Sequence, residues 1–136
     1  MLQLEVPLTL IAIDVAQDSV MAWAAAQDLP GDVAYKLRLV LEELLVNLVQ
    51  HGVFLADQPD VRLDLSVVDG LVAGRIEDAA APFDPRSAPE PAAASVDDDR
   101  VGGLGLALVR RVTSDLVYGR APDGWNRTDF TIPLAV

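Results

Sequence analysis

The chain has 136 residues and a net charge of −11, from 21 acidic and 10 basic residues, and it contains no cysteine. The length predicts a single domain over residues 1–136, and the missing cysteines exclude disulfides and thiolate metal sites. The acid excess argues against nucleic acid or an anionic membrane as a partner. Without an apolar run of ~20 residues or a basic N-terminal region, we expect a cytoplasmic protein.

The first quarter of the chain predicts a strand and then a helix. Residues 2–6 alternate between apolar and polar side chains, which predicts a short strand. Thr9 or Asp14 can start an alanine-rich helix that runs to about Gln27. A proline–glycine pair then breaks the helix, and we expect Asp32 to be the N-cap of the next one.

The stretch Lys36–Gly52 has no proline and has glycine only at its end, so it predicts one long helix. Leucines recur at helical spacing and predict a face that packs on a core. These are Leu37, Leu41, Leu44, Leu45 and Leu48. On another face, Glu43, Asn47 and His51 lie one above another. Apolar neighbours border this polar stripe, and because buried polar groups need partners, we expect it to bind something.

The polar stripe has two interpretations. Carboxylate and amide oxygens are ligands that Mg²⁺ accepts alongside waters and phosphates, and a carboxylate one helical turn away could act as a general base. Alternatively, Glu43 and Asn47 are solvated surface residues, Gly52 caps the helix, and His51 lies near its negative end. The helix alone does not decide between them.

Four further segments predict strands. Residues 61–68 alternate in polarity, Asp69–Gly70 is a two-residue hairpin signal, and residues 71–77 return as the partner strand. Residues 115–120 and 126–134 form a second pair around a proline–aspartate–glycine turn. Antiparallel strands behind a helix predict a sheet with helices on one face.

Between these strand pairs the composition changes. Four of the nine prolines fall within residues 82–91, and alanines and an aspartate run at 97–99 follow. About 20 residues without regular structure are unusual in a compact domain. We therefore predict a lid loop at about residues 79–101.

Three glycines then lead into an apolar-periodic helix. They are Gly102, Gly103 and Gly105, and the leucine and valine stripe that follows predicts the packed face, at Leu104, Leu108 and Val112. Glycines at a helix N-terminus permit a backbone nest that binds anions. The alternative is a flexible hinge. The pattern matches neither a P-loop nor a dinucleotide fingerprint.

The order of these motifs carries a resemblance. Glu43-x3-Asn47-x3-His51-Gly52 on a helix, Asp78 at the end of a hairpin strand, a proline-rich segment and Gly-Gly-Leu-Gly-Leu opening a helix resemble the GHKL (Bergerat-fold) ATPase and kinase superfamily. The closest resemblance is to the RsbW-like anti-sigma factors and serine-protein kinases, whose Pro-Phe-Asp-Pro stretch recurs at residues 82–85. It covers nearly the whole chain.

The resemblance implies an α+β fold, a two-layer sandwich whose mostly antiparallel sheet is covered on one face by about three helices. It implies that Glu43 activates the attacking hydroxyl or water, that Asn47 coordinates the Mg²⁺ on the ATP phosphates, and that Asp78 accepts a hydrogen bond from the adenine amino group. His51 falls in the same ATP site. The phosphates would lie in a cradle made by Gly102, Gly103, Leu104, Gly105 and Leu106.

One residue departs from the family pattern, because Ala80 stands where members usually carry glycine. If this position has a positive φ or lies against the base, its Cβ strains the turn or crowds adenine. Such a change could weaken ATP binding about tenfold, which corresponds to ~1.4 kcal/mol.

The implied function is an ATP-dependent serine/threonine kinase that sequesters a sigma factor and phosphorylates a STAS-type antagonist, with a homodimer as a further expectation. The main alternative is a protein-binding module of the same fold with weak or no ATP binding. Histidine-kinase catalysis would need a phosphoacceptor helix hairpin supplied in trans. A fourth interpretation is an interaction protein whose glycines are incidental.

Overall fold

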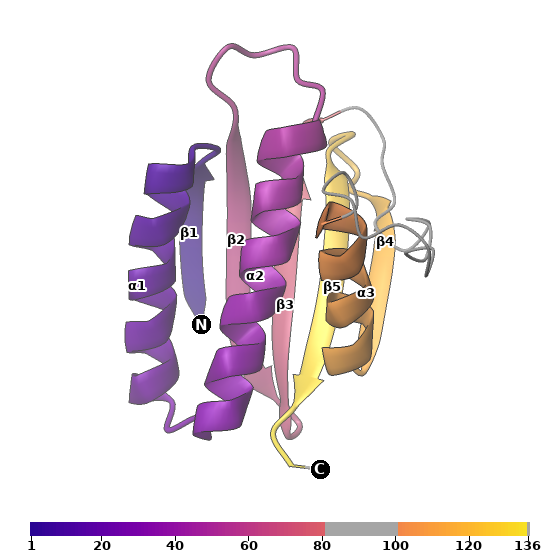
Figure 1. Ribbon diagram of the computed structural model, residues 1–136. Coiled ribbons are helices and arrows are strands. Elements are labelled where there is room, and N and C mark those ends of the chain that lie inside the picture. Colours follow the sequence, from indigo (N-terminus) through magenta and orange to yellow (C-terminus); the bar gives the residue numbers. More distant parts are fainter. Residues whose placement is uncertain (81–100, 136) are drawn as a thin grey trace.

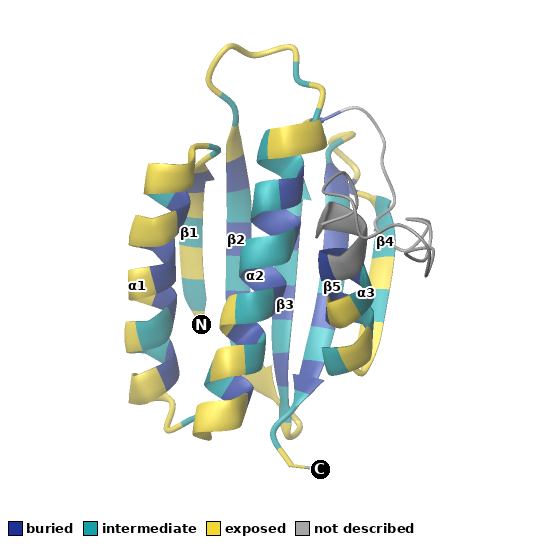
Figure 2. Ribbon diagram, in the orientation of Figure 1, coloured by how far each residue is buried: buried dark blue, intermediate teal, exposed yellow. Residues whose placement is uncertain are grey.

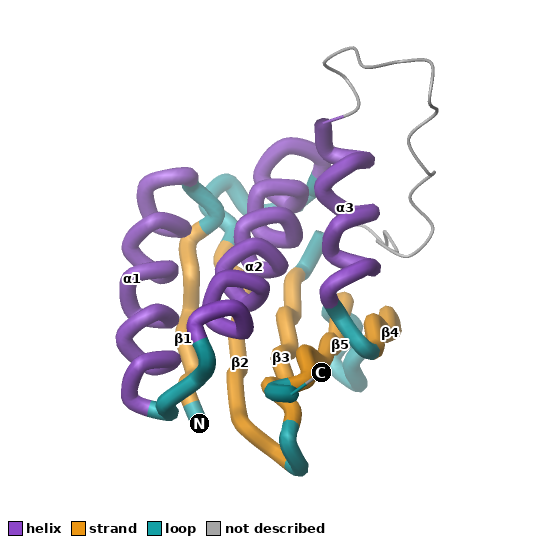
Figure 3. Tube along the Cα trace, turned by 60° about the horizontal axis from the view of Figure 1, so that its bottom comes forward, coloured by secondary structure: helices purple, strands orange, loops and turns teal. Residues whose placement is uncertain are grey.

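The computed structural model describes residues 1–80 and 101–135. Its elements are β1 (Leu2–Pro7), α1 (Leu10–Ala26), α2 (Gly31–His51), β2 (Asp60–Val68), β3 (Leu71–Asp78), α3 (Val101–Val112), β4 (Asp115–Arg120) and β5 (Asn126–Pro133). The strands form one sheet in the order β1-β2-β3-β5-β4, and each neighbouring pair is antiparallel. The three helices lie on the same side of this sheet, as Figures 1 and 3 show. The predicted two-layer α+β sandwich is confirmed.

The core lies between the sheet and the helices α1, α2 and α3, where the buried faces of both layers meet (Figure 2). The predicted leucine face of α2 is buried except at Leu48, which is only partly buried and borders the core. On β2 the inward positions are fully buried as far as Leu65, whereas Val67 is exposed. No helix in the described ranges is long and apolar enough to cross a membrane.

Local signals explain most element ends. The Thr9 hydroxyl oxygen accepts a hydrogen bond from the Ala12 N–H at 3.1 Å and so caps α1. Asp69 and Gly70 both have positive φ, as a type I′ hairpin turn requires. The prediction that Asp32 caps α2 is wrong: α2 begins at Gly31 after Pro30, which provides no side-chain cap. Asp32 lies in the first turn instead, where its negative charge interacts favourably with the positive end of the helix dipole.

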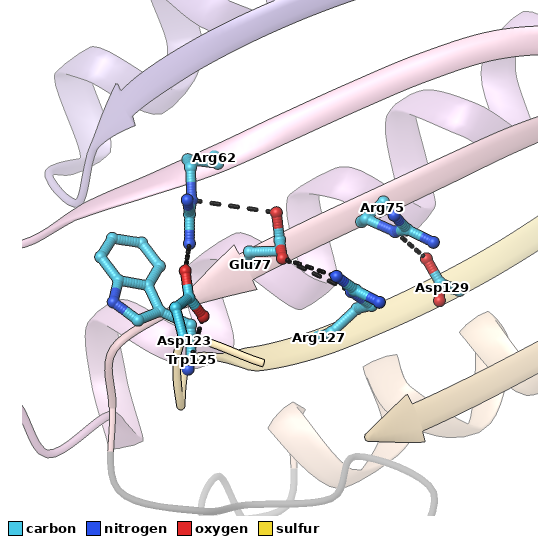
Figure 4. A network of polar contacts seen from close by, with 7 residues as sticks. All are labelled: Arg62, Arg75, Glu77, Asp123, Trp125, Arg127 and Asp129. Atoms are coloured by element: carbon cyan, nitrogen blue, oxygen red, sulfur yellow. Dashed lines mark hydrogen bonds and ion pairs between the residues drawn. The ribbon is translucent and has the colours of Figure 1, made fainter. Parts of the chain in front are cut away.

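The sheet face away from the helices carries cross-strand pairs of opposite charge (Figure 4). Glu77 of β3 pairs with Arg127 of β5, with Oε2 and Nη2 3.4 Å apart. Two residues further from the end of β3, on the same face, Arg75 Nε donates to Asp129 Oδ1 at 2.7 Å. Partly exposed pairs add little stability each, but opposite charges across a ladder favour one register.

The same face fixes the turn between β4 and β5. The Arg62 guanidinium of β2 donates to Asp123 Oδ2 at 2.8 Å and lies 4.0 Å from the Trp125 ring centroid (Figure 4). Asp123 Oδ1 accepts from the Trp125 N–H at 3.0 Å, and the pKa of Asp123 is lowered chiefly by the bond from Arg62. The turn that leads into β5 is therefore tied to a strand two places away in the sheet.

Gly74 of β3 lies opposite Phe130 of β5, and the Phe130 ring occupies the space above it. A Cβ built on Gly74 would overlap that ring. Because Phe130 is 1% exposed, the ring has no room to move aside. Glycine is needed here for close packing.

We predict that Gly74→Ala lowers the free energy of unfolding by about 1–3 kcal/mol, the usual cost of overpacking. Urea denaturation measures this change. Gly119→Ala is the matched control on the same sheet, because a Cβ at Gly119 meets nothing within 4 Å. Equal midpoints for the two variants would contradict the packing argument.

Candidate functional site

The predicted site residues converge at one end of the molecule. Asn47 and His51 lie in the last turns of α2, Asp78 is the last residue of β3, and α3 begins close by (Figure 1). Figure 3 shows α2 and α3 packed beside each other above the sheet. The structure therefore brings together elements that 20 to 60 residues separate along the chain.

Glu43 and Asn47 lie one turn apart on α2. Asn47 is 9% exposed, and Glu43 is half-buried. Burial, followed by the charge of Glu42, raises the pKa of the Glu43 carboxyl. The interpretation that both are solvated surface residues is therefore wrong. His51, at the end of the same stripe, is exposed.

Gly52 ends α2 in an extended conformation, with φ −67° and ψ 140°, so it is not the left-handed glycine cap that ends many helices. A Cβ at Gly52 would meet Leu48 O and the ring of Phe54. The absence of a side chain lets the chain after α2 fold closely over the last helical turn.

The glycine cluster differs from its prediction. Gly102, Gly103 and Gly105 lie within α3, which begins at Val101, so they do not form a loop before the helix. Gly105 is buried against Glu43, and a Cβ built on it would overlap the Glu43 carboxylate. At this position glycine is needed because it lets α3 approach α2 closely.

The prediction of the packed face of α3 is wrong at Leu108, whereas Val112 is partly buried against the core as predicted. Leu106 and Val109 are buried, whereas Leu108 is 41% exposed. Both stripes have helical spacing, and packing against α2 and the core selected the second. Leu106 therefore offers a ligand no side-chain atom, and the side chain of Leu104 lies outside the described part of α3.

Asp78 is 4% exposed, and its carboxylate is held by two donors. Oδ1 accepts from the Ala80 N–H at 2.9 Å and from Asn126 Nδ2 at 3.0 Å. Burial is the largest effect on Asp78 and raises its pKa; these two bonds and the charge of Arg120 act in the opposite direction. A carboxyl group whose pKa is shifted by burial is a candidate element of a binding site.

Ala80 fits the turn after β3 without strain. Among described residues other than glycine, only Asp28 and Asp69 have positive φ, so Ala80 has an ordinary backbone conformation. Its N–H closes a turn onto the Asp78 side chain, and its carbonyl accepts from Asn126 Nδ2 at 2.7 Å. The expected backbone strain is therefore absent.

Sequence reasoning missed the partners of Asp78. Asn126 is 2% exposed, and its Oδ1 accepts from the Tyr118 hydroxyl at 2.6 Å. The available signal was the inward-facing row of β5, where Asn126 and Thr128 precede Phe130 and Ile132. Two polar residues at core positions near a strand end indicate a binding site or a hydrogen-bond network.

The predicted lid falls outside the described residues apart from its ends at residues 79, 80 and 101. Within residues 1–80 and 101–135, no group of three or more His, Cys, Asp or Glu side chains could hold a metal ion. Asn47 offers an amide oxygen, a type of ligand that Mg²⁺ accepts together with waters and phosphates.

We predict that Gly105→Ala drives the Glu43 carboxylate toward solvent. Glycine to alanine in a helix normally stabilises by about 1 kcal/mol, but here the Cβ requires Glu43 to move. Because burial is the main cause of the raised pKa, that pKa should fall in a ¹³C NMR titration. In Gly31→Ala, where a Cβ meets nothing within 4 Å, Glu43 should titrate as in the wild type. An unchanged Glu43 titration in Gly105→Ala would show that the contact does not bury the carboxyl group.

We also predict that Asp78→Asn raises the free energy of unfolding at pH 7. The folded-state pKa of Asp78 is raised, so ionisation destabilises the folded protein above that pKa, and acidification relieves the penalty. The advantage of the variant should therefore shrink as pH falls, as urea denaturation at several pH values would measure. Asp115→Asn, at an exposed site on β4, should change little. A variant less stable than wild type at pH 7 would refute this account.

Comparison with known proteins identifies relatives of this chain. The profile of the histidine kinase-like ATPase domain matches residues 6–131. The chain is 36% identical over 98 residues to the serine/threonine-protein kinase BtrW of Bordetella bronchiseptica, covering 71% of this chain and 68% of that protein.

Solved structures share the fold. The Erythrobacter litoralis EL346 blue-light activated histidine kinase matches with a TM-score of 0.54 and 26% identity over 79% of this chain, which spans 32% of that kinase. The histidine kinase domain of the same protein matches with a TM-score of 0.54 and 19% identity, over 95% of this chain and 62% of the domain structure. The profile match extends over most of the sequence, and the chain therefore belongs to the histidine kinase-like ATPase domain family.

Proposed function

We propose that the chain binds ATP with Mg²⁺ where α2 and β3 end and α3 begins, and transfers the γ-phosphate to a serine or threonine of another protein. The observation that supports this most directly is the buried Asp78 carboxylate, fixed through Oδ1 at the same end of the molecule as the buried Asn47. The family and the similarity to the kinase BtrW point in the same direction.

Each residue has a role in this proposal. Asp78 accepts a hydrogen bond from the adenine amino group. Asn47 offers its amide oxygen to Mg²⁺, which fits a metal that takes its other ligands from phosphates and water. When bound, Mg²⁺ would neutralise charge on the phosphates. Glu43 takes the proton of the attacking hydroxyl, and its raised pKa brings it closer to the range of an effective base at neutral pH.

The partners we propose are a STAS-type anti-sigma factor antagonist, as phosphate acceptor, and a sigma factor, as the sequestered protein, in the cytoplasm. The support is the resemblance to RsbW-like proteins and the kinase relative. The net charge of −11 suits protein partners with basic surfaces better than nucleic acid.

One observation favours a second function, a protein-binding module with weak or no ATP binding. The glycine segment is helical and Gly105 lies against the Glu43 carboxylate, so these elements lie close together where phosphates would have to fit. ATP binding would then require the start of α3 to change conformation.

Calorimetry and phosphotransfer assays separate these functions. We expect wild type to bind Mg-ATP with micromolar to sub-millimolar affinity, and Asn47→Ala to lose the Mg²⁺-dependent part. Glu43→Gln should keep binding but slow phosphotransfer by about 100-fold or more, because it removes the base and keeps the shape. Glu42→Gln, one residue away on α2, is the control and should retain both. No heat at millimolar Mg-ATP would reject the kinase and leave the binding module.

A further inference from the structure

The amide of Asn126 makes hydrogen bonds to the two ends of the turn that follows β3. Its Nδ2 donates to Asp78 Oδ1 at 3.0 Å and to the Ala80 carbonyl at 2.7 Å. Asn126 and Asp78 face each other across β5 and β3 at the last register position of the pair. One buried side chain therefore fixes both the carboxylate and the backbone two residues beyond it.

The direction of these bonds is determined by chemistry. Asp78 Oδ1 and the Ala80 carbonyl are both acceptors, so the amide must point its NH₂ group toward them. Its carbonyl oxygen then faces the Tyr118 hydroxyl at 2.6 Å, and the hydroxyl must donate. A chain of hydrogen bonds thus runs in one direction from β4 through β5 to the end of β3.

This series of hydrogen bonds limits which oxygen of Asp78 can take a proton or accept from a ligand. Oδ1 already accepts two N–H groups, so a proton could sit only on Oδ2. A ligand donor approaching the carboxylate likewise has Oδ2 as its acceptor. The fixed Oδ1 sets the plane of the carboxylate and hence the direction in which Oδ2 accepts.

We propose that Asn126 is a positioning residue that aims the Asp78 carboxylate at the exocyclic amino group of a purine, and so makes the site select adenine over a base with a carbonyl at that place. The proposal rests on the proposed ATP binding. A carbonyl facing a buried, correctly aimed carboxylate leaves both acceptors without a donor. A carboxylate free to turn away would discriminate less.

The surroundings support a positioning role. Asn126 lies opposite Arg120 in the pairing of β5 with β4. The turn between these two residues is tied through Asp123 to Arg62 on the other sheet face. The network is therefore held from both sides of the sheet, so that the amide has a defined position.

Among the described residues, few other titratable groups lie near Asp78. On β4, Arg120 lowers the Asp78 pKa by its charge. The Tyr118 hydroxyl donates to the side-chain amide of Asn126, which in turn donates to Asp78. The inward neighbours on β5, Asn126 and Thr128, carry no charge, and α2 brings Glu43 and His51 to this end of the molecule. Removing the Asn126 donor should raise the pKa of Asp78, because that bond stabilises the ionised form.

The test compares ATP with ITP, which carries a carbonyl in place of the amino group. In Asn126→Leu we expect ATP affinity to fall about tenfold or more and ITP affinity to change little, so that the ATP/ITP ratio falls. Without nucleotide, the Asp78 carboxyl should titrate at higher pH by ¹³C NMR, with Asp78→Asn assigning the signal. Arg127→Leu is the matched control, because the neighbouring side chain of the same strand points to the other sheet face. It should leave the ratio and the titration unchanged.

The outcomes are distinct. An unchanged ATP/ITP ratio together with an unchanged Asp78 titration in Asn126→Leu overturns the proposal. If wild type binds no ATP, the proposed function fails, and the titration alone supports or overturns the action of Asn126 on Asp78. If Asn126→Leu does not fold, Tyr118→Phe takes its place. Loss of the hydroxyl donor should lower the ATP/ITP affinity ratio about threefold, since one neutral hydrogen bond is removed. An unchanged ratio would overturn the role of the hydrogen bonds that lead from Tyr118 through Asn126 to Asp78.

Discussion

The burial of the leucine face of α2 on the sheet is the interaction on which the rest of the structure depends. Leu37, Leu41 and Leu45 are fully buried against strand residues such as Leu63 and Leu65. Because side chains on a helix have fixed angular positions, this packing also decides where the polar face points. Glu43 is thereby directed toward Gly105 of α3, and Asn47 lies one turn further along the same face. The candidate site therefore follows from the core.

Close approach between elements depends on two positions without side chains. The absence of a side chain at Gly74 leaves room for the ring of Phe130, so that β3 and β5 pack tightly beneath the helices. The absence of a side chain at Gly105 lets α3 lie against the Glu43 carboxylate. In the first case glycine serves packing alone. In the second it brings a charged group into a poorly solvated place, and the raised pKa of Glu43 is the electrostatic consequence.

The two faces of the sheet do different work. The outer face carries charge pairs that favour the observed strand register, and Arg62 ties down the turn before β5. The inner face at the same strand ends carries Asp78 and Asn126, whose side chains are buried and joined. Since side chains alternate along a strand, a register slip of one residue would exchange these faces. The outer charge pairs therefore help to keep the candidate site assembled.

Much of this protein can be predicted from local sequence. The strand alternation of residues 61–68, the Asp69–Gly70 turn and the leucine spacing of α2 each depend on residues close in the chain. Each matches the structure apart from the exposed Val67 and the partly buried Leu48. The motif order also indicated the family. The sequence left Thr9 and Asp14 as alternative starts of α1, and the structure selects Thr9 as the cap.

Tertiary structure decided the rest. Two stripes of α3 have helical spacing, and only packing against α2 and the core buries Leu106 and Val109 in preference to Leu108. The bond from Asn126 to Asp78 joins residues 48 positions apart, and periodicity carries no information about such a pair. Helices and strands repeat every few residues, so a local sequence pattern predicts which side chains share a face. Which faces and side chains meet is settled by packing among all the elements at once.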